Sequence, residues 1–191
     1  MISFNNKIVW ITGASSGIGE HLAEEFAREG ATVIISSHEA DELDRVKKKL
    51  RPVSETVYPV VFNLGDPVAV QNAAELVLQR FGRIDVLMNN GGISQRSLVA
   101  ETPVDIDRRL MEIDYFSGVI LAKAVLPGMI ERGAGWFGVT STIAGKFGFP
   151  LRSAYSAAKH ALFGFYESLL AENLPRSLRP KNGTFDETRA P

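Results

Sequence analysis

Lys7-Ile8-Val9-Trp10-Ile11-Thr12-Gly13-Ala14-Ser15-Ser16-Gly17-Ile18-Gly19 joins a short apolar run to a glycine-rich turn and the start of an amphipathic segment. Gly13 permits a tight turn, Gly17 lets the backbone approach a pyrophosphate, and Gly19 allows close packing between helix and strand. The free N–H groups at the start of a helix attract an anion. Three glycines between a first strand and a first helix therefore predict a dinucleotide-binding turn.

The alternation of apolar runs and amphipathic segments continues along the chain. Strands are expected over 7–12, 32–36, 57–62, 84–88 and 136–140, and helices over 17–29, 40–50, 67–81, 104–132 and 153–172. Strands and helices in regular alternation form a parallel sheet with helices on both faces. The sequence predicts an α/β fold, a Rossmann-type doubly wound parallel sheet in three α/β/α layers, with residues 1–173 as one NAD(P)-binding domain.

Composition narrows the class of partner. The 191 residues are 45% hydrophobic and 23% charged, and 21 Lys and Arg against 22 Asp and Glu give a net charge of -1, which predicts no nucleic-acid partner. There is no cysteine, and His21, His38 and His160 have no metal-ligand spacing, so no metal site is expected. No uninterrupted apolar run reaches about 18 residues. A cytoplasmic protein without a membrane span, acting on a small molecule, is predicted.

Tyr155 and Lys159 lie four residues apart in a predicted helix, so both side chains leave the same face. A nearby positive charge lowers the pKa of a phenol from its usual value of about 10 by favouring the phenolate. The pair is therefore a candidate proton-transfer device. By itself this spacing also fits a half-buried tyrosine beside a solvated lysine.

The end of the second predicted strand bears on the choice of dinucleotide. An acidic residue at this place would hold the ribose 2'-hydroxyl and repel a 2'-phosphate. Ser37 occupies it, so NADP(H) is not excluded, although no Arg or Lys clamps a phosphate at His38 or in the glycine loop. The sequence favours NADP(H) over NAD(H), with Ser15, Ser16 and His38 as candidate phosphate contacts.

Three motifs in the same order resemble those of the short-chain dehydrogenase/reductase family over residues 7–173. They are Thr12-Gly-x-x-x-Gly17-x-Gly19, Asn89-Asn90-Gly91-Gly92 and Tyr155-x-x-x-Lys159. The stretches 89–97 and 152–160 are most similar to the branch named dehydrogenase/reductase family member 7 and 7B.

The resemblance implies hydride transfer between nicotinamide and a carbonyl or alcohol carbon, with Tyr155 giving or taking the proton. It also implies that Lys159 lowers the pKa of Tyr155 and holds the nicotinamide ribose, and that Asn89 bridges neighbouring strands. Expected cofactor contacts are Gly13, Ser15, Ser16, Gly17, Ile18, Gly19, Ser37, His38, Asn63, Leu64, Asn90, Gly91 and Lys159.

Three positions depart from the family pattern. Thr142 stands for the substrate-orienting serine, Asp114 for an asparagine that anchors a proton relay to the lysine, and Asn63, before Leu64, for an aspartate at the adenine. An ionised Asp114 near Lys159 would raise the pKa of Tyr155 and slow catalysis or move its optimum to higher pH. The expected catalytic set is Tyr155, Lys159, Thr142 and Asp114. A catalytically weakened NAD(P)-binding regulatory or relic protein is the alternative.

After Glu172 the pattern has neither a sixth apolar strand nor the Pro-Gly that the family places beneath the nicotinamide. Residues 174–191 resemble the family's substrate loop, and we expect them to be a remnant of it, discontinuous with the preceding chain near residues 173–175. If so, a strand and one wall of the substrate pocket are lost.

Substrate and assembly are read from apolar residues outside the main pattern. Phe147, Phe149 and Leu151 favour an apolar carbonyl or alcohol substrate. Two helices carry apolar residues beyond one core-facing stripe, which predicts a homodimer or homotetramer; these residues are Tyr115, Phe116, Leu121, Phe163, Phe165 and Tyr166.

Overall fold

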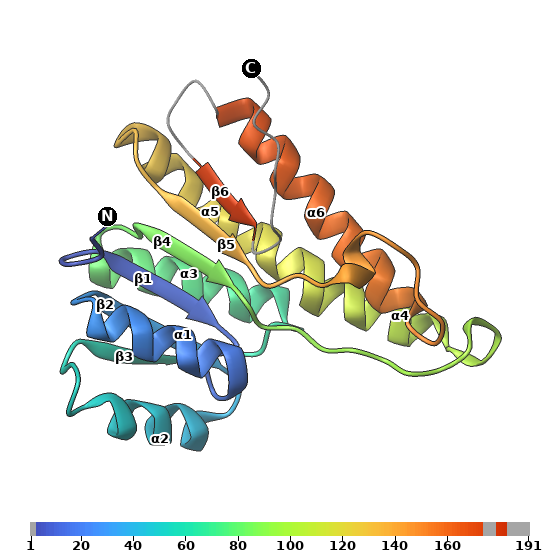
Figure 1. The fold of residues 1–191 in the computed structure, drawn as a ribbon, viewed down its shortest axis with the longest axis horizontal. Coiled ribbons are helices and arrows are strands. Elements are labelled where there is room, and N and C mark those ends of the chain that lie inside the picture. Colours follow the sequence, from blue (N-terminus) through green and yellow to red (C-terminus); the bar gives the residue numbers. More distant parts are fainter. Residues whose placement is uncertain (1–2, 174–178, 183–191) are drawn as a thin grey trace.

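A computed structural model of the chain describes residues 3–173 and 179–182. Six strands, all parallel, form one sheet in the order β3-β2-β1-β4-β5-β6 (Figure 1). The strands are β1 Ile8–Thr12, β2 Thr32–Ser37, β3 Val57–Val61, β4 Val86–Asn89, β5 Trp136–Val139 and β6 Arg179–Asn182. The strand order reverses between β1 and β4. Ligands of open α/β sheets bind at the carboxyl ends of the strands beside such a reversal.

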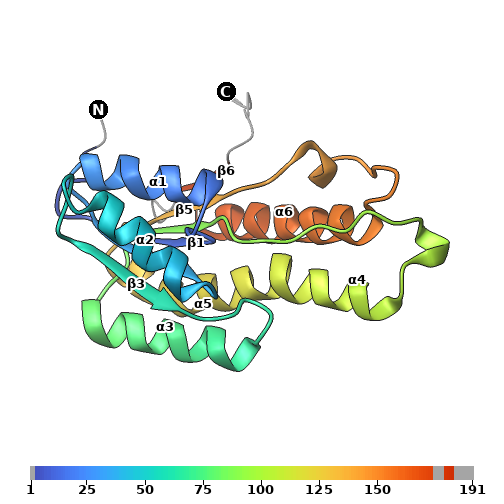
Figure 2. The same cartoon turned by 90° about the horizontal axis from the view of Figure 1, so that it is seen from below.

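The helices lie in two layers, one on each face of the sheet (Figure 2). They are α1 Gly17–Arg28, α2 Ala40–Leu50, α3 Pro67–Phe81, α4 Val104–Met111, α5 Ser117–Glu131 and α6 Ser153–Asn173. Helices α1 and α2 pack on one face, and α3, α5 and α6 pack on the other. The predicted three-layer Rossmann-type α/β fold is confirmed.

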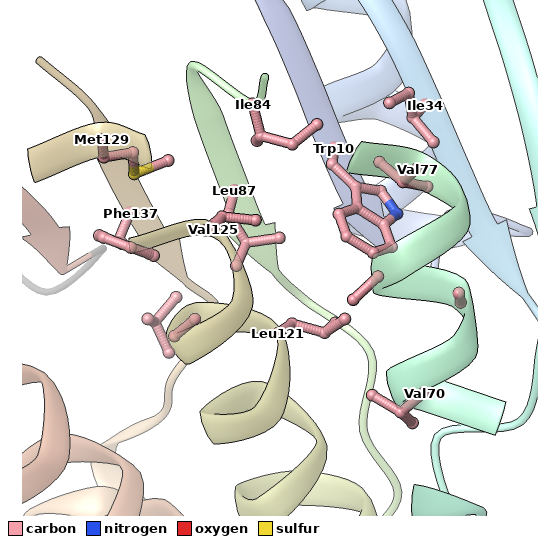
Figure 3. Packing of buried hydrophobic residues seen from close by; sticks show 14 of the residues in the cluster. Trp10, Ile34, Val70, Val77, Ile84, Leu87, Leu121, Val125, Met129 and Phe137 are labelled. Carbon is pink, nitrogen blue, oxygen red and sulfur yellow. The ribbon is translucent and has the colours of Figure 1, made fainter. Parts of the chain in front are cut away.

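Strand β1 shows how the pattern of residues builds both layers. Alternate side chains of a strand point to opposite faces. Val9 and Ile11 therefore pack beneath α1 and α2, whereas Trp10 enters the other layer between α3 and α5 (Figure 3). The indole Nε1 of Trp10 donates to Ser36 Oγ at 2.8 Å, so this buried polar group is satisfied.

The sixth strand was not predicted. Arg179–Asn182 pairs in parallel with β5, with Arg179 opposite Trp136. The four residues Arg-Pro-Lys-Asn have no apolar alternation, so nothing in their side chains signalled a strand. Backbone pairing with β5 provides it instead, and Pro180, which lacks an N–H, is tolerated because β6 lies at the edge of the sheet.

The long helix expected over 104–132 is continuous but not uniform. Between α4 and α5 the turn Glu112–Phe116 is π-helical, and Ser117 N–H donates back to Glu112 O. Turns of this kind inside α-helices are frequent at functional sites. Here the π-helical turn carries Asp114, and that side chain is buried.

Within the described residues, the helix Val104–Glu131 has the length and composition of a membrane span, with 28 residues and a mean hydropathy of 1.4 in an 18-residue window, 44% of it buried in the fold. A core helix meets the same criteria. Leu121, Val125 and Met129 pack in the core that α3 and α6 share (Figure 3). The expected lack of a membrane span stays a prediction.

Leu121 and Tyr166, which the sequence predicts at an oligomer surface, belong to the core. Leu121 is 0% exposed and Tyr166 is 1% exposed, because the sheet and the neighbouring helix bury more of each helix than a single stripe. Phe116 is 45% exposed, and Tyr115, Phe163 and Phe165 are half-buried. The predicted homo-oligomer therefore loses two of its supporting residues.

Candidate active site

The glycine loop is shaped by close backbone packing on one side and open space on the other. A Cβ added at Gly19 would lie 2.2 Å from Gly13 O, and one added at Gly13 would lie 2.5 Å from Gly91 Cα. Gly17, with φ +56°, has no atom within 4 Å of such a Cβ. Gly13 and Gly19 thus let the loop pack against the end of β4, and Gly17 leaves room for a ligand at the start of α1.

Asn90 fastens this loop to the sheet. Its Nδ2 donates to Thr12 O at 3.1 Å and to Gly13 O at 3.0 Å, and its Oδ1 accepts from Thr140 Oγ1 at 2.8 Å. The ends of β1, β4 and β5 are joined by this one side chain.

Asn89 has a structural role at the end of β4, as predicted, and its side chain adds contacts to the helix layer. Its Nδ2 donates to Gly118 O at 3.2 Å and contacts the buried hydroxyl of Tyr166. Its backbone joins β4 to β5, since it lies opposite Val139 and its O accepts from Thr140 N–H at 3.0 Å, and its side chain also ties β4 to helices α5 and α6. Its place at the end of β4 turns the side chain toward the helix layer.

A cavity of about 350 Å³ opens where β1, β2, β3 and β4 end. Most of the predicted cofactor residues line it, namely Gly13, Ser15, Ser16, Ser37, His38, Asn63, Leu64, Asn90 and Gly91. Gly17 and Ile18 line an apolar hollow at the start of α1 instead, and Gly19 and Lys159 line neither. The structure brings the loop ends predicted to hold a dinucleotide to one place.

Asn63, predicted as a cofactor contact, caps a turn and lies at the edge of the cavity. Its Oδ1 accepts from Gly65 N–H at 2.9 Å, which caps the turn after β3, and the residue also lines the cavity. Leu64 beside it packs within 2.5 Å of where a Cβ on Gly91 would lie. The turn and the absence of a side chain at Gly91 together shape this wall.

Glu39 is a cavity residue that the sequence analysis missed. Ser15 Oγ donates to Glu39 Oε2 at 2.8 Å, and Glu39 N–H donates to Ser37 Oγ at 3.2 Å. A carboxylate thus lies between the glycine loop and the end of β2. The signal for Glu39 is its place two residues after β2, whereas the sequence-based prediction names Ser37 and His38 there.

Further unpredicted lining comes from residues distant in the sequence or outside the motifs. Arg109 on α4 and Ile113 on the π-helical turn reach the cavity only because the long helix runs past the end of β4. No local pattern signals them. The others are Phe62, Gly92 and Ile93.

The proposed catalytic side chains lie around a second hollow, of about 320 Å³. Tyr155 on the first turn of α6 and Thr142 after β5 both line it, together with Ser94, Ile143, Ala144, Phe149 and Arg152. The neighbouring hydroxyl of Ser141 is outside this lining. Lys159, one turn along α6, is buried behind Tyr155, with its Nζ 5.6 Å from the centre of the phenol ring.

Gln95 was not predicted, yet it positions Tyr155. Its Oε1 accepts from Tyr155 N–H at 3.2 Å, and its Nε2 donates to Ser153 Oγ at 3.3 Å. The first N–H groups of a helix have no partner within the helix. Gln95 supplies one for α6 and so fixes the start of this helix against the segment after β4.

Asp114 and Lys159 form a buried ion pair. Lys159 Nζ lies 3.4 Å from Asp114 Oδ2, and Asp114 Oδ1 accepts from Ile93 N–H at 2.7 Å. Burial raises the pKa of Asp114, whereas Lys159 and the Ile93 N–H act to lower it. The pair ties α6 to the long helix and to the segment after β4.

The pKa of Tyr155 is raised, first by burial and then by the negative charge of Asp114. Arg152 and the Thr142 side chain act in the opposite direction. The expectation that Asp114 raises this pKa agrees with the structure. The net shift is upward, whereas the Tyr155/Lys159 spacing predicted a lowered pKa; the nearest charge to Lys159 Nζ among the described residues is Asp114 Oδ2, 3.4 Å away.

Comparison with known proteins places the chain in a family. The family model described as "short chain dehydrogenase" matches residues 7–180. The chain belongs to the short-chain dehydrogenase family. The glycine loop, the Asn89-Asn90-Gly91-Gly92 segment and the Tyr155/Lys159 pair all lie within the matched region.

Two relatives illustrate the branch of the short-chain dehydrogenase family. The chain is 45% identical over 170 residues to "Dehydrogenase/reductase SDR family protein 7-like" of Drosophila melanogaster, covering 87% of this chain and 52% of that protein. It is 43% identical over 171 residues to "Dehydrogenase/reductase SDR family member 7B" of Mus musculus, covering 87% and 53%. The chain thus spans about half the length of these relatives, and the predicted branch is confirmed.

Solved structures of short-chain dehydrogenases share the fold. A short-chain dehydrogenase from Streptomyces avermitilis superposes with a TM-score of 0.88 at 34% identity, covering 95% of this chain and 65% of that one. A short-chain dehydrogenase/reductase from Burkholderia phymatum, solved in complex with NAD, gives 0.89 at 25% identity and covers 95% and 66%.

Proposed function

We propose that the protein is an NAD(P)(H)-dependent oxidoreductase that interconverts a carbonyl and a secondary alcohol, with Tyr155 as the general acid and base. The observation that carries this proposal is the shared hollow of Tyr155 and Thr142 beside the larger cavity. Ile93 lines the larger cavity and Ser94 lines the hollow, so the two adjoin along one segment. A dinucleotide and a small substrate could therefore meet there.

The residues present fit a dinucleotide. Gly17 leaves open space at the start of α1, and Ser16, the residue before that helix, makes no side-chain cap, so the first N–H groups are available to a pyrophosphate. The cavity follows the ends of four strands, as an extended ligand requires. A related protein was solved with NAD. When bound, the nicotinamide supplies or accepts the hydride.

Residues of the chain would transfer the proton and orient the substrate. The Tyr155 hydroxyl donates a proton to the carbonyl oxygen in reduction and takes it back in oxidation. Thr142 has a hydroxyl that can orient the same oxygen. The raised pKa of Tyr155 disfavours the phenolate that alcohol oxidation needs and keeps the proton-donating form that carbonyl reduction uses.

A panel of ketones and aldehydes, assayed with NADH and with NADPH, tests the proposed function. We expect turnover that disappears in a Tyr155→Phe variant. Dinucleotide binding without any Tyr155-dependent turnover would instead support the alternative of a regulatory or relic protein.

The choice of dinucleotide is proposed differently from the sequence-based expectation. Glu39 places a carboxylate at the cavity edge formed by Ser15 and Ser37, where an acidic group favours a ribose 2'-hydroxyl and repels a 2'-phosphate. We therefore propose NAD(H) in place of NADP(H). The sequence-based prediction of NADP(H) depends on Ser37 and does not include the carboxylate of Glu39.

Replacing Glu39 by glutamine tests this choice. Loss of the negative charge should lower the Kd for NADPH by about tenfold and raise the Kd for NADH by a smaller factor. Fluorescence titration of both reduced dinucleotides measures the two constants. Asp41→Asn removes the same charge from the exposed first turn of α2, outside the cavity lining, and should change neither. A wild-type protein that binds NADPH more tightly would overturn the NAD(H) proposal.

Replacing Asp114 by asparagine should increase alcohol oxidation near neutral pH several-fold. Oxidation needs the phenolate, and the Asp114 charge raises the pKa of Tyr155, so its removal lowers that pKa and moves the rising limb of the pH–rate profile to lower pH. Asparagine keeps an oxygen for Ile93 N–H. Asp105→Asn, on the exposed side of α4, is the matched control. An unchanged or alkaline-shifted profile would contradict this account.

The lining of the hollow bears on the polarity of the proposed substrate. Phe149 and Ile143 line the hollow, which supports a partly apolar substrate, whereas Phe147 and Leu151 lie outside the lining.

We retain a homo-oligomer and a cytoplasmic location as proposals. The sequence from 174 to 178 and from 183 to 191, predicted as a substrate-loop remnant, lies outside the described residues.

A further inference from the structure

The hollow beside Tyr155 has one charged side chain in its wall, Arg152. The remaining lining residues are hydroxyl-bearing or apolar, among them Thr142, Ile143 and Phe149. Arg152 immediately precedes α6, and the guanidinium lies 6.0 Å from the centre of the Tyr155 ring. The group that would protonate a carbonyl and a fixed positive charge thus face the same small space.

The position of Arg152 is held from both sides. Its Nη1 contacts Ser94 Oγ, on the segment that follows β4, and its backbone N–H donates to Phe149 O at 3.2 Å. The guanidinium is therefore anchored to the segment after β4, and the backbone of Arg152 is anchored to the loop after β5. Among the described residues, Ser94 is the one hydrogen-bond partner of this guanidinium, which carries five N–H donors.

No carboxylate within residues 3–173 and 179–182 forms an ion pair with Arg152. Asp114, the acidic group that acts on Tyr155, is fully buried and paired with Lys159. A half-buried guanidinium next to an apolar wall is a favourable partner for a planar anion, because its fork of donors matches a carboxylate.

We propose that Arg152 binds a carboxylate of the substrate, so that the protein acts on carbonyl compounds that combine an apolar body with an acid group. This inference rests on the proposed function. In reduction, the carbonyl carbon receives a hydride from the reduced nicotinamide and its oxygen receives the proton of Tyr155. The ketone becomes a secondary alcohol, and the carboxylate stays paired with Arg152.

Three aryl keto acids test the proposal, namely benzoylformate, benzoylacetate and benzoylpropionate, each compared with its methyl ester. Their ketone and carboxylate are separated by progressively more carbons, so the preferred acid reports the spacing between Tyr155 and Arg152. We expect the intact chain to reduce at least one acid with a kcat/KM about tenfold or more above that of its ester. Arg152→Met should remove that preference by raising KM for the acid, with little change for the ester.

Two further variants separate anion binding from a role as a clamp between loops. Arg152→Lys keeps the charge and should retain part of the preference for the acid. Arg96→Met removes an exposed charge from the same segment, outside the hollow, and should change neither substrate. Equal use of acid and ester by the wild type, or an equal loss of both in Arg152→Met, would overturn the proposal.

Calorimetric binding of the same acids and esters with NAD⁺ present keeps this proposal separable from the proposed function. If no compound is turned over, the oxidoreductase assignment fails. Tighter binding of an acid than of its ester, lost in Arg152→Met, would still support the anion site, and equal binding would overturn it.

Discussion

Replacing Tyr155 by phenylalanine is expected to lower kcat for carbonyl reduction by about 100- to 10,000-fold, the range that a positioned general acid contributes. The substitution removes one oxygen and keeps the ring, which lines the hollow with Thr142 and Phe149. The backbone N–H of Tyr155 still bonds to Gln95. Substrate and dinucleotide should therefore bind as before, and the loss should appear in kcat.

Single-turnover kinetics and fluorescence titration of NADH separate the two effects. Tyr58→Phe is the matched control, because Tyr58 packs on Phe81 and Arg80 at β3, far from the hollow. It should retain wild-type kcat. Residual activity of Tyr155→Phe near the wild-type value would assign the proton to another group and refute the proposed mechanism.

Replacing Gly19 by alanine is expected to destabilise the protein by about 1–3 kcal/mol, as overpacking of a close contact does. The new Cβ would lie 2.2 Å from Gly13 O and 2.6 Å from Asn90 Nδ2. The first of these atoms belongs to the backbone, and the Asn90 amide is held by three hydrogen bonds. The loop must shift, and dinucleotide binding should weaken with it.

Gly164→Ala provides the matched control for this loss. Gly164 lies inside α6 with no atom within 4 Å of an added Cβ, and it is exposed. Alanine there should stabilise the helix by about 0.5–1 kcal/mol. Urea unfolding of both variants should thus give changes of opposite sign in the free energy of unfolding. A neutral or stabilising Gly19→Ala would show that the loop does not pack as described.

The fold was predictable because most of its strands and helices have a clear local pattern in the sequence. The five predicted strands and their helices appear within a few residues of the expected bounds because each has strong periodicity and a clear start or stop. Helix α3, for example, begins after Asp66, which accepts from Val68 N–H and Ala69 N–H, and ends at Gly82 with φ +73°. Strand β6 has no such pattern and exists through its pairing with β5.

The candidate site was predictable where a motif carries it. Tyr155, Lys159 and the glycine loop were found because their spacing places them on predicted elements, and Thr142 was found through the resemblance to the family pattern. Glu39 was overlooked although it stands just after a strand. No local sequence pattern indicated that Arg109 lines the cavity. It does so because of the path of α4, a helix that begins about forty residues after β3.

The sequence by itself determined the layers of the fold, the glycine turn and the presence of a phenol and an ammonium on one helical face. These depend on contacts between residues close in the chain, where periodicity and spacing are sufficient. Only the tertiary structure decided the surroundings of that pair, namely how deeply Tyr155 is buried and how close Asp114 lies to Lys159. Burial of the phenol is the first cause that raises the pKa of Tyr155, and the charge of Asp114, which a π-helical turn buries 3.4 Å from Lys159 Nζ, raises it further. The spacing of Tyr155 and Lys159 alone predicted a lowered pKa. Electrostatic effects at a site depend on burial and on distance through space, and both are set only when distant segments pack together.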